Sequence, residues 1–200
     1  MIFIFVLFSG KMSFCRITGE KYCKCQNKMD SIDALQVDIK ATMRKLFTDH
    51  AVYTKFVING IVDGSNDVQA LLLRLLQNQS DIGDQLAPII GKENGKILTE
   101  LLQEHIEFAG EVIMQAKAGN DDRIATKRLF ANSRAIASFL SSLSDKLPFS
   151  EFKSMFDQHN QFVIDMTVSR LQQDYETEIV QFDAYYNAIL EMSDSIVSAF

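Results

Sequence analysis

The segment "LFTDHAVYTKFVI", Leu46–Ile58, determines the fold class of this chain and raises the question of its function. Apolar residues recur in it and around it at steps of three and four, the period of an amphipathic α-helix. The predicted helix runs from about Ser31, with Asp30 or Ser31 as its N-cap, to Val62. His50 interrupts the apolar stripe, where a polar side chain must find a partner to be buried. The full stripe is Leu35, Ile39, Met43, Leu46, His50, Tyr53, Val57 and Ile61.

The same period predicts four further long helices, joined by links too short for anything but antiparallel neighbours. Between the first and second long helices, "VQALLLRLLQ" and a turn of helix around Asp81 read as two pieces too short to span a bundle. The sequence therefore predicts an all-α, up-down antiparallel bundle of four to five long helices, with a short helical excursion between the first and second. The later helices are predicted at about 93–118, 121–143, 150–172 and 179–196, and Gly119 is expected to end the first of these. Their apolar stripes include Leu98, Leu129, Met166 and, in the last helix, Ile179, Phe182, Tyr186 and Ile189.

Composition limits the partners of the protein. The chain has 200 residues, enough for one domain with a sizeable core, and 47% of them are hydrophobic. Its net charge of −6 argues against nucleic acid as the main partner, because phosphate binding needs a basic surface. A homo-oligomer remains compatible with this composition, and a cytoplasmic location is favoured.

Residues 1–28 differ from the rest of the chain, and we interpret them as an N-terminal extension outside a bundle domain of residues 29–200. The opening "MIFIFVLF" is shorter than the roughly 20 apolar residues that span a bilayer. Residues 1–11 could still act as a signal or anchor, which would make the protein secreted or membrane-associated; alternatively, translation starts later, at Met12 or Met29. This segment also holds every cysteine of the chain, Cys15, Cys23 and Cys25, and an odd number does not indicate a disulfide framework.

The chain has three histidines, each on the apolar stripe of a different predicted helix. At 1.5 Å per residue, their distances from the turns are about 15 to 21 Å and agree within about 2 Å for each antiparallel pair. They should therefore lie at one level with Asn132, provided that the excursion returns to the end of the bundle that it left. The residues of this predicted layer are His50, His105, His159 and Asn132, and the carboxylates that flank it are Asp49, Glu104, Glu111 and Asp165.

Three hypotheses follow from such a layer. In the first, His50, His105 and His159 bind a divalent transition metal or a small polar ligand, with Asn132, Asp49, Glu104 and Asp165 as candidates to orient the rings. In the second, the layer only fixes the register of a structural or protein-interaction bundle. In the third, the protein is an enzyme that uses His50, Glu104 or His159 as acid or base.

Motifs for the common enzyme classes are absent from the sequence. "GKENGK" has the wrong spacing for a phosphate-binding loop. No Gly-x-Ser-x-Gly, His-Glu-x-x-His or Glu-x-x-His is present, which excludes a nucleophile elbow, a zincin helix and the ligand pattern of di-iron carboxylate bundles.

About residues 40 to 197 resemble a family of small all-helical bacterial proteins of unknown role, which also occur in large viruses. The family pattern has Asp-His in its first helix, Arg-Leu-Leu-x-Asn-x-x-Asp-Ile in the excursion, Glu-His in the second, Asn in the third, and His followed by Asp in the fourth. This chain departs from the pattern with Tyr53 in place of Trp and Asn187 in place of His or Glu. The matching residues are Asp49, His50, Arg74, Leu75, Leu76, Asn78, Asp81, Ile82, Glu104, His105, Asn132, His159 and Asp165.

Some members of that family carry the label acetylglutamate kinase. True enzymes of that name look like α/β kinases with glycine-rich phosphate loops, and nothing in this sequence would hold ATP in that way. The resemblance therefore implies a helical fold and a shared set of polar residues, with no activity attached.

Overall fold

The computed structural model describes the backbone of residues 21–200 and the side chains of residues 37–200. The described residues form six α-helices and no strand, which confirms the all-α prediction. The predicted count of four to five long helices is wrong. The helices are α1 (Lys21–Asp63), α2 (Val68–Ile90), α3 (Lys92–Ala118), α4 (Arg123–Leu143), α5 (Phe149–Leu171) and α6 (Tyr175–Ala199).

The error in the count lies in α2, which is one helix of 23 residues where the sequence indicated two short pieces. Ser80, Asp81 and Gly83 suggest a turn locally, but the buried side chains continue through them at helical steps. Burial of an apolar stripe outweighs local propensity, which differs by 1 kcal/mol or less per residue. Pro88 lies in the last turn of α2, so it interrupts the hydrogen bonding of that turn alone. The stripe consists of Leu75, Gln79, Ile82, Leu86 and Ile90.

The boundaries of the other helices follow the sequence more closely. Gly119, with a φ of 67°, ends α3 in the left-handed conformation that favours glycine. α1 begins at Lys21, so residues 21–28 of the predicted extension are helical; residues 1–20 lie outside the described part of the chain. The structure divides into two units, Met1–Asp38 and Ile39–Phe200. None of the helices in the described residues is long and apolar enough to cross a membrane.

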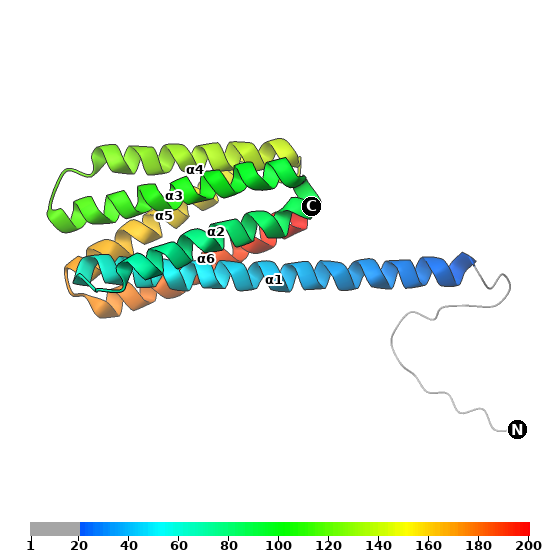
Figure 1. Ribbon diagram of the computed structural model, residues 1–200, viewed down its shortest axis with the longest axis horizontal. Coiled ribbons are helices and arrows are strands. Elements are labelled where there is room, and N and C mark those ends of the chain that lie inside the picture. The colour runs from blue at the N-terminus through cyan, green and yellow to red at the C-terminus, as the bar shows by residue number, and fades with distance from the viewer. Residues whose placement is uncertain (1–20) are drawn as a thin grey trace, which may run out of the picture. The chain divides into compact units, whose positions relative to one another are not determined.

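Within the unit Ile39–Phe200, consecutive helices run in opposite directions and each packs on the next from α2 to α6 (Figure 1). α1 contacts both the first helix of this series, α2, and the last, α6. The amide of Asn78 on α2 donates to the carbonyl of Leu46 on α1 over 2.9 Å, and the hydroxyls of Thr48 on α1 and Tyr186 on α6 lie 3.0 Å apart. The six helices therefore surround a common core, across which α3 also contacts α5.

The full length of α2 changes how the histidine layer arises. α3 starts at the end of the bundle opposite to the end of α1 (Figure 1), so the condition that the excursion returns to the end that it left is not met. His105 lies 14 residues from Gly91 and 14 from Gly119, at the midpoint of α3. The position of His105 along the bundle axis is therefore the same whichever way α3 runs, so His105 still lies at the level of the other two histidines.

Gly83 on α2 is a point of close approach between α2 and α3. A Cβ built there would lie 2.0 Å from Thr99 Oγ1 and 2.8 Å from the Gly95 carbonyl oxygen, whereas a Cβ at Gly110 meets nothing within 4 Å. We expect Gly83→Ala to lower the free energy of unfolding by about 1–3 kcal/mol through overpacking. Gly110→Ala should raise it by about 0.5–1 kcal/mol through helix propensity. Urea denaturation measures both, and a Gly83→Ala variant at least as stable as the wild-type protein would contradict the close approach.

Candidate functional site

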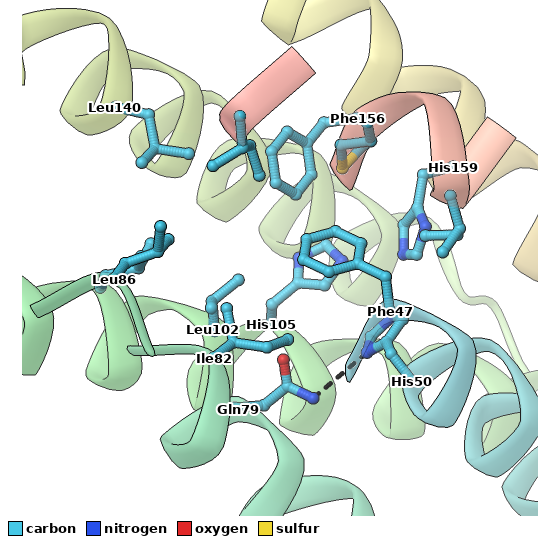
Figure 2. Close-up of a pocket in the computed structure, with 14 residues that line it drawn as sticks. Phe47, His50, Gln79, Ile82, Leu86, Leu102, His105, Leu140, Phe156 and His159 are labelled. Carbon is cyan, nitrogen blue, oxygen red and sulfur yellow. Dashed lines mark hydrogen bonds between the residues drawn. The ribbon is translucent and has the colours of Figure 1, made fainter. Parts of the chain in front are cut away.

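The three histidines predicted to share a layer are buried and adjacent in the structure. His50, His105 and His159 are 7%, 3% and 5% exposed. His159 is central: its ring centroid lies 5.6 Å from that of His50 and 5.5 Å from that of His105. In Figure 2, His50, His105 and His159 border the same cavity. Three helices, α1, α3 and α5, thus bring the only imidazoles of the chain together.

His105 is held in one orientation by Asn132. The Asn132 amide nitrogen donates to the Leu101 carbonyl over 3.1 Å and to Glu104 over 3.3 Å, which turns its oxygen toward His105. That oxygen lies 3.0 Å from His105 Nδ1, so Nδ1 carries the proton and donates. His105 Nε2 then presents a lone pair, and it is buried with no hydrogen-bond partner.

His50 is oriented by Gln79 of α2. The Gln79 amide nitrogen donates to the Leu75 carbonyl over 2.9 Å and lies 3.2 Å from His50 Nδ1. An amide nitrogen is only a donor, so Nδ1 of His50 accepts and its proton is on Nε2. The two rings thus differ in tautomer: Nε2 of His105 carries a lone pair, whereas Nε2 of His50 carries the proton.

His159 and Tyr185 complete the layer with polar atoms that lack partners. His159 Nδ1 and the Tyr185 hydroxyl are buried and make no hydrogen bond, although the two rings lie 5.3 Å apart. The Thr54 hydroxyl interacts with Tyr185, but the two form no hydrogen bond of standard geometry. Buried polar groups are nearly always paired, so these atoms are candidates for contact with a ligand or water.

Burial keeps all three imidazoles neutral. It lowers the pKa of His50 to about 3, with a smaller contribution from His105. It lowers the pKa of His105 to about 4, against the opposing effect of the Asn132 hydrogen bond. Burial, followed by the proximity of His105 and His50, holds the pKa of His159 well below its ordinary value. Neutral imidazole is the form that binds transition metals and accepts hydrogen bonds.

Two cavities flank the histidine layer, and all three histidines line both. The larger, which we call the apolar cavity, has a volume of about 30 Å³ and is shown in Figure 2. The smaller cavity, of about 20 Å³, is lined also by Thr54 and by residues of α1, α2, α3 and α5. One water needs about 10–15 Å³ on this measure, so each cavity has room for one or two molecules of that size.

The carboxylates that the sequence proposed as partners of the rings behave differently from the histidines. Asp49 binds Lys45 over 2.8 Å and Arg74 over 3.1 Å, and Asp165 accepts from Gln161. Neither hydrogen-bonds a histidine. Glu104 is exposed and reaches His105 only through Asn132. Glu111, also considered, pairs with Arg128.

Within the described residues, no group of three or more His, Cys, Asp or Glu side chains is arranged to hold a metal ion. The three histidine rings are adjacent, but their nitrogens do not converge on one point. The cysteines of the N-terminal segment lie where side chains are not described.

Sequence reasoning missed two members of the layer, Gln79 and Tyr185. Gln79 was missed because the sequence was interpreted as two short helical pieces in place of α2. The helical spacing of Leu75, Gln79 and Ile82 was the signal that could have found it. On α6 the predicted stripe ran through Ile179 and Tyr186, but Ile179 is 59% exposed and Tyr185 is fully buried. The prediction took a step of three residues back from Ile189, to Tyr186. A step of four, which a helix allows equally well, leads to the buried Tyr185.

Comparison with known proteins gives no relative from which to infer a function. The chain matches no protein-family model, and it matches no curated protein and no solved structure. The resemblance described from the sequence therefore stays a prediction.

Proposed function

We propose that the protein binds one divalent transition-metal ion between His50, His105 and His159. The observation that carries the proposal is the contact of three imidazoles from three helices, with the buried Nε2 of His105 unpartnered at the centre of the bundle. Three histidines with a fourth position open to water or substrate are the donor set of several zinc sites.

The surroundings of the rings favour a metal as well. Tetrahedral ligation at about 2.1 Å from each nitrogen separates neighbouring ring centroids by about 5 Å, close to the 5.5 and 5.6 Å observed around His159. The bond from His105 Nδ1 to the Asn132 oxygen supplies the outer partner that metal-bound imidazoles usually have.

Binding requires two adjustments in the layer. The rings must turn until three nitrogens face one point, and His50 must move its proton from Nε2 to Nδ1. Gln79 would then have to present its oxygen to His50 and give up its bond to the Leu75 carbonyl. The proposal therefore predicts that Gln79→Glu, whose side chain only accepts hydrogen bonds in its ionised form, strengthens metal binding.

The test is a zinc titration of untagged full-length protein in which Cys15, Cys23 and Cys25 are replaced by serine. Because the chain has no other histidine, all histidine-dependent binding then reports on the layer. We expect one zinc ion per chain. At free zinc 100-fold above Kd, the stabilisation is about 2.7 kcal/mol, which raises Tm by about 5–10 °C.

The matched variants are His50→Ala and Thr167→Val. Thr167 is buried and polar but lies outside the layer, where its hydroxyl donates to the Val163 carbonyl over 2.8 Å. His50→Ala should abolish the rise in Tm with zinc. Thr167→Val should be less stable than the wild-type protein but should still be stabilised by zinc. An equal response in wild type and His50→Ala would refute the metal site.

A structural layer hydrated by buried water is the second candidate function, and the two cavities favour it. Waters in them would lie beside His105 and His159, and could satisfy His105 Nε2 and His159 Nδ1 without a metal. In that case the histidine variants are less stable, and zinc changes the Tm of none of them.

A further inference from the structure

The apolar cavity differs in chemistry from the layer that forms its edge. Its only polar side chains are those of His50, Gln79, His105 and His159, at one side. In Figure 2, Leu86 and Leu140 lie across the cavity from His50 and His159, with Phe156 and Leu102 between them. The other ten lining residues are aliphatic, aromatic or methionine side chains: Phe47, Ile82, Leu86, Leu98, Leu102, Leu140, Phe156, Ile189, Met192 and Ile196.

This lining determines what can occupy the cavity. Water needs two to four polar partners, and away from the histidines the cavity offers none. Cavities lined by leucine, isoleucine and phenylalanine stay dry and take up small apolar molecules. The volume of about 30 Å³ excludes anything much larger than a diatomic molecule or a single heavy atom.

We propose that the apolar cavity binds a small uncharged molecule of the size of a diatomic gas and holds it beside the histidine rings. The role of this ligand rests on the proposed function, because a metal ion bound by the three histidines would border the cavity with its open position. The smaller cavity, which adds the Thr54 hydroxyl to the three histidines, is the better place for water.

Xenon is the probe, because it is uncharged, close in size to the ligand and independent of any metal. Full-length metal-free protein with ¹³C-labelled methyl groups is equilibrated with increasing xenon pressure and followed by NMR. We expect saturable shifts of the methyl resonances of Ile82, Leu98 and Leu140, which line the apolar cavity alone. An absence of saturable shifts in wild-type protein would overturn the proposal.

Two substitutions on the same helix provide the matched comparison. Leu86 and Leu75 both lie on α2 and are 0% and 2% exposed, but Leu86 lines the apolar cavity and Leu75 the smaller one. Leu86→Phe should lose the saturable xenon shifts, and Leu75→Phe should keep them. Leu102→Phe, at a partly buried position of the same cavity, should behave as Leu86→Phe and serves if that variant does not fold.

The xenon and zinc measurements test the two proposals separately, so either proposal can be refuted without the other. Saturable xenon binding without zinc binding leaves the cavity site in place and removes the metal. Zinc binding without saturable xenon shifts supports the metal and refutes the cavity site. Xenon shifts that persist in both Leu86→Phe and Leu102→Phe refute the cavity site whatever the zinc titration shows.

Discussion

Metal-free protein should unfold in mild acid, at a pH between about 4 and 5. Below pH 6.5 the unfolded chain binds protons at His50, His105 and His159, whereas burial keeps the folded rings neutral until much lower pH. Each histidine therefore costs about 1.4 kcal/mol of stability per pH unit, and three together about 4 kcal/mol per unit. A total stability of about 6–10 kcal/mol, within the usual range for natural domains, is used up within about 1.5 to 2.5 pH units below 6.5.

The sign of the effect follows from the direction of the shifts. Because the pKa values of the folded rings are lowered, the histidines cost no stability well above pH 6.5, where they are neutral in both states. The free energy of unfolding then falls progressively as the pH drops toward 3–4. Urea denaturation at a series of pH values, with a chelator present, gives the free energy of unfolding directly. Its slope between pH 6 and 5 should correspond to about three protons taken up on unfolding.

His159→Phe tests the assignment of this slope to the layer. The variant removes one titrating ring, so the slope should fall by about 1.4 kcal/mol per pH unit whatever the absolute stability. A free energy of unfolding that is flat between pH 7 and 5 in the wild-type protein would show that the rings are not buried as neutral groups.

Glu178→Gln should be among the most damaging single substitutions in the bundle. Glu178, on α6, is 2% exposed and forms salt bridges with Lys55 of α1 and Arg170 of α5, the latter at 3.3 Å. Burial lowers the pKa of the Lys55 ammonium, and the Glu178 carboxylate opposes that shift. The substitution leaves the partly buried Lys55 ammonium without its carboxylate, whereas Arg170 keeps its salt bridge with Asp63. The expected loss is about 3 kcal/mol in the free energy of unfolding, the low end for breaking a buried pair.

Two further variants separate this effect from a general sensitivity to glutamate loss. Glu93→Gln breaks an exposed pair with Lys96 and should change stability by less than about 1 kcal/mol. Replacing Lys55 and Glu178 together by Met and Leu should recover part of the loss, because no unpaired charge then remains between them. A loss below 1 kcal/mol for Glu178→Gln would mean that water reaches this carboxylate.

Residues with clear local signals were placed correctly from the sequence. Gly119 ends α3 where glycine was expected to do so, and Leu98, Leu129 and Met166 are buried as their stripes predicted. The histidine layer also follows from counting along helices, since a helix fixes height as well as direction. These inferences succeed because they depend on one helix at a time.

The remaining features depend on what another helix does. Gln79 is buried in a segment with turn-forming residues because α2 packs between α1 and α3. Asp49 comes directly before His50 in α1, but its carboxylate accepts from Arg74, which lies 25 residues later in the chain. The empty space beside the layer arises from the fit of many side chains at once. No pattern within a single segment contains that information.

The closing contacts of the bundle have a consequence for synthesis on the ribosome. The hydroxyls of Thr48 and Tyr186 are 138 residues apart in sequence, and Arg44 and Asp194, joined at 2.7 Å, are 150 apart. Pairings of such separation form late, because a long loop must close first. Tyr185 stands against His159 only when the last helix has emerged and docked. A nascent chain that stalls before α6 lacks the Tyr185 ring beside His159, so the layer is complete only after α6 has docked.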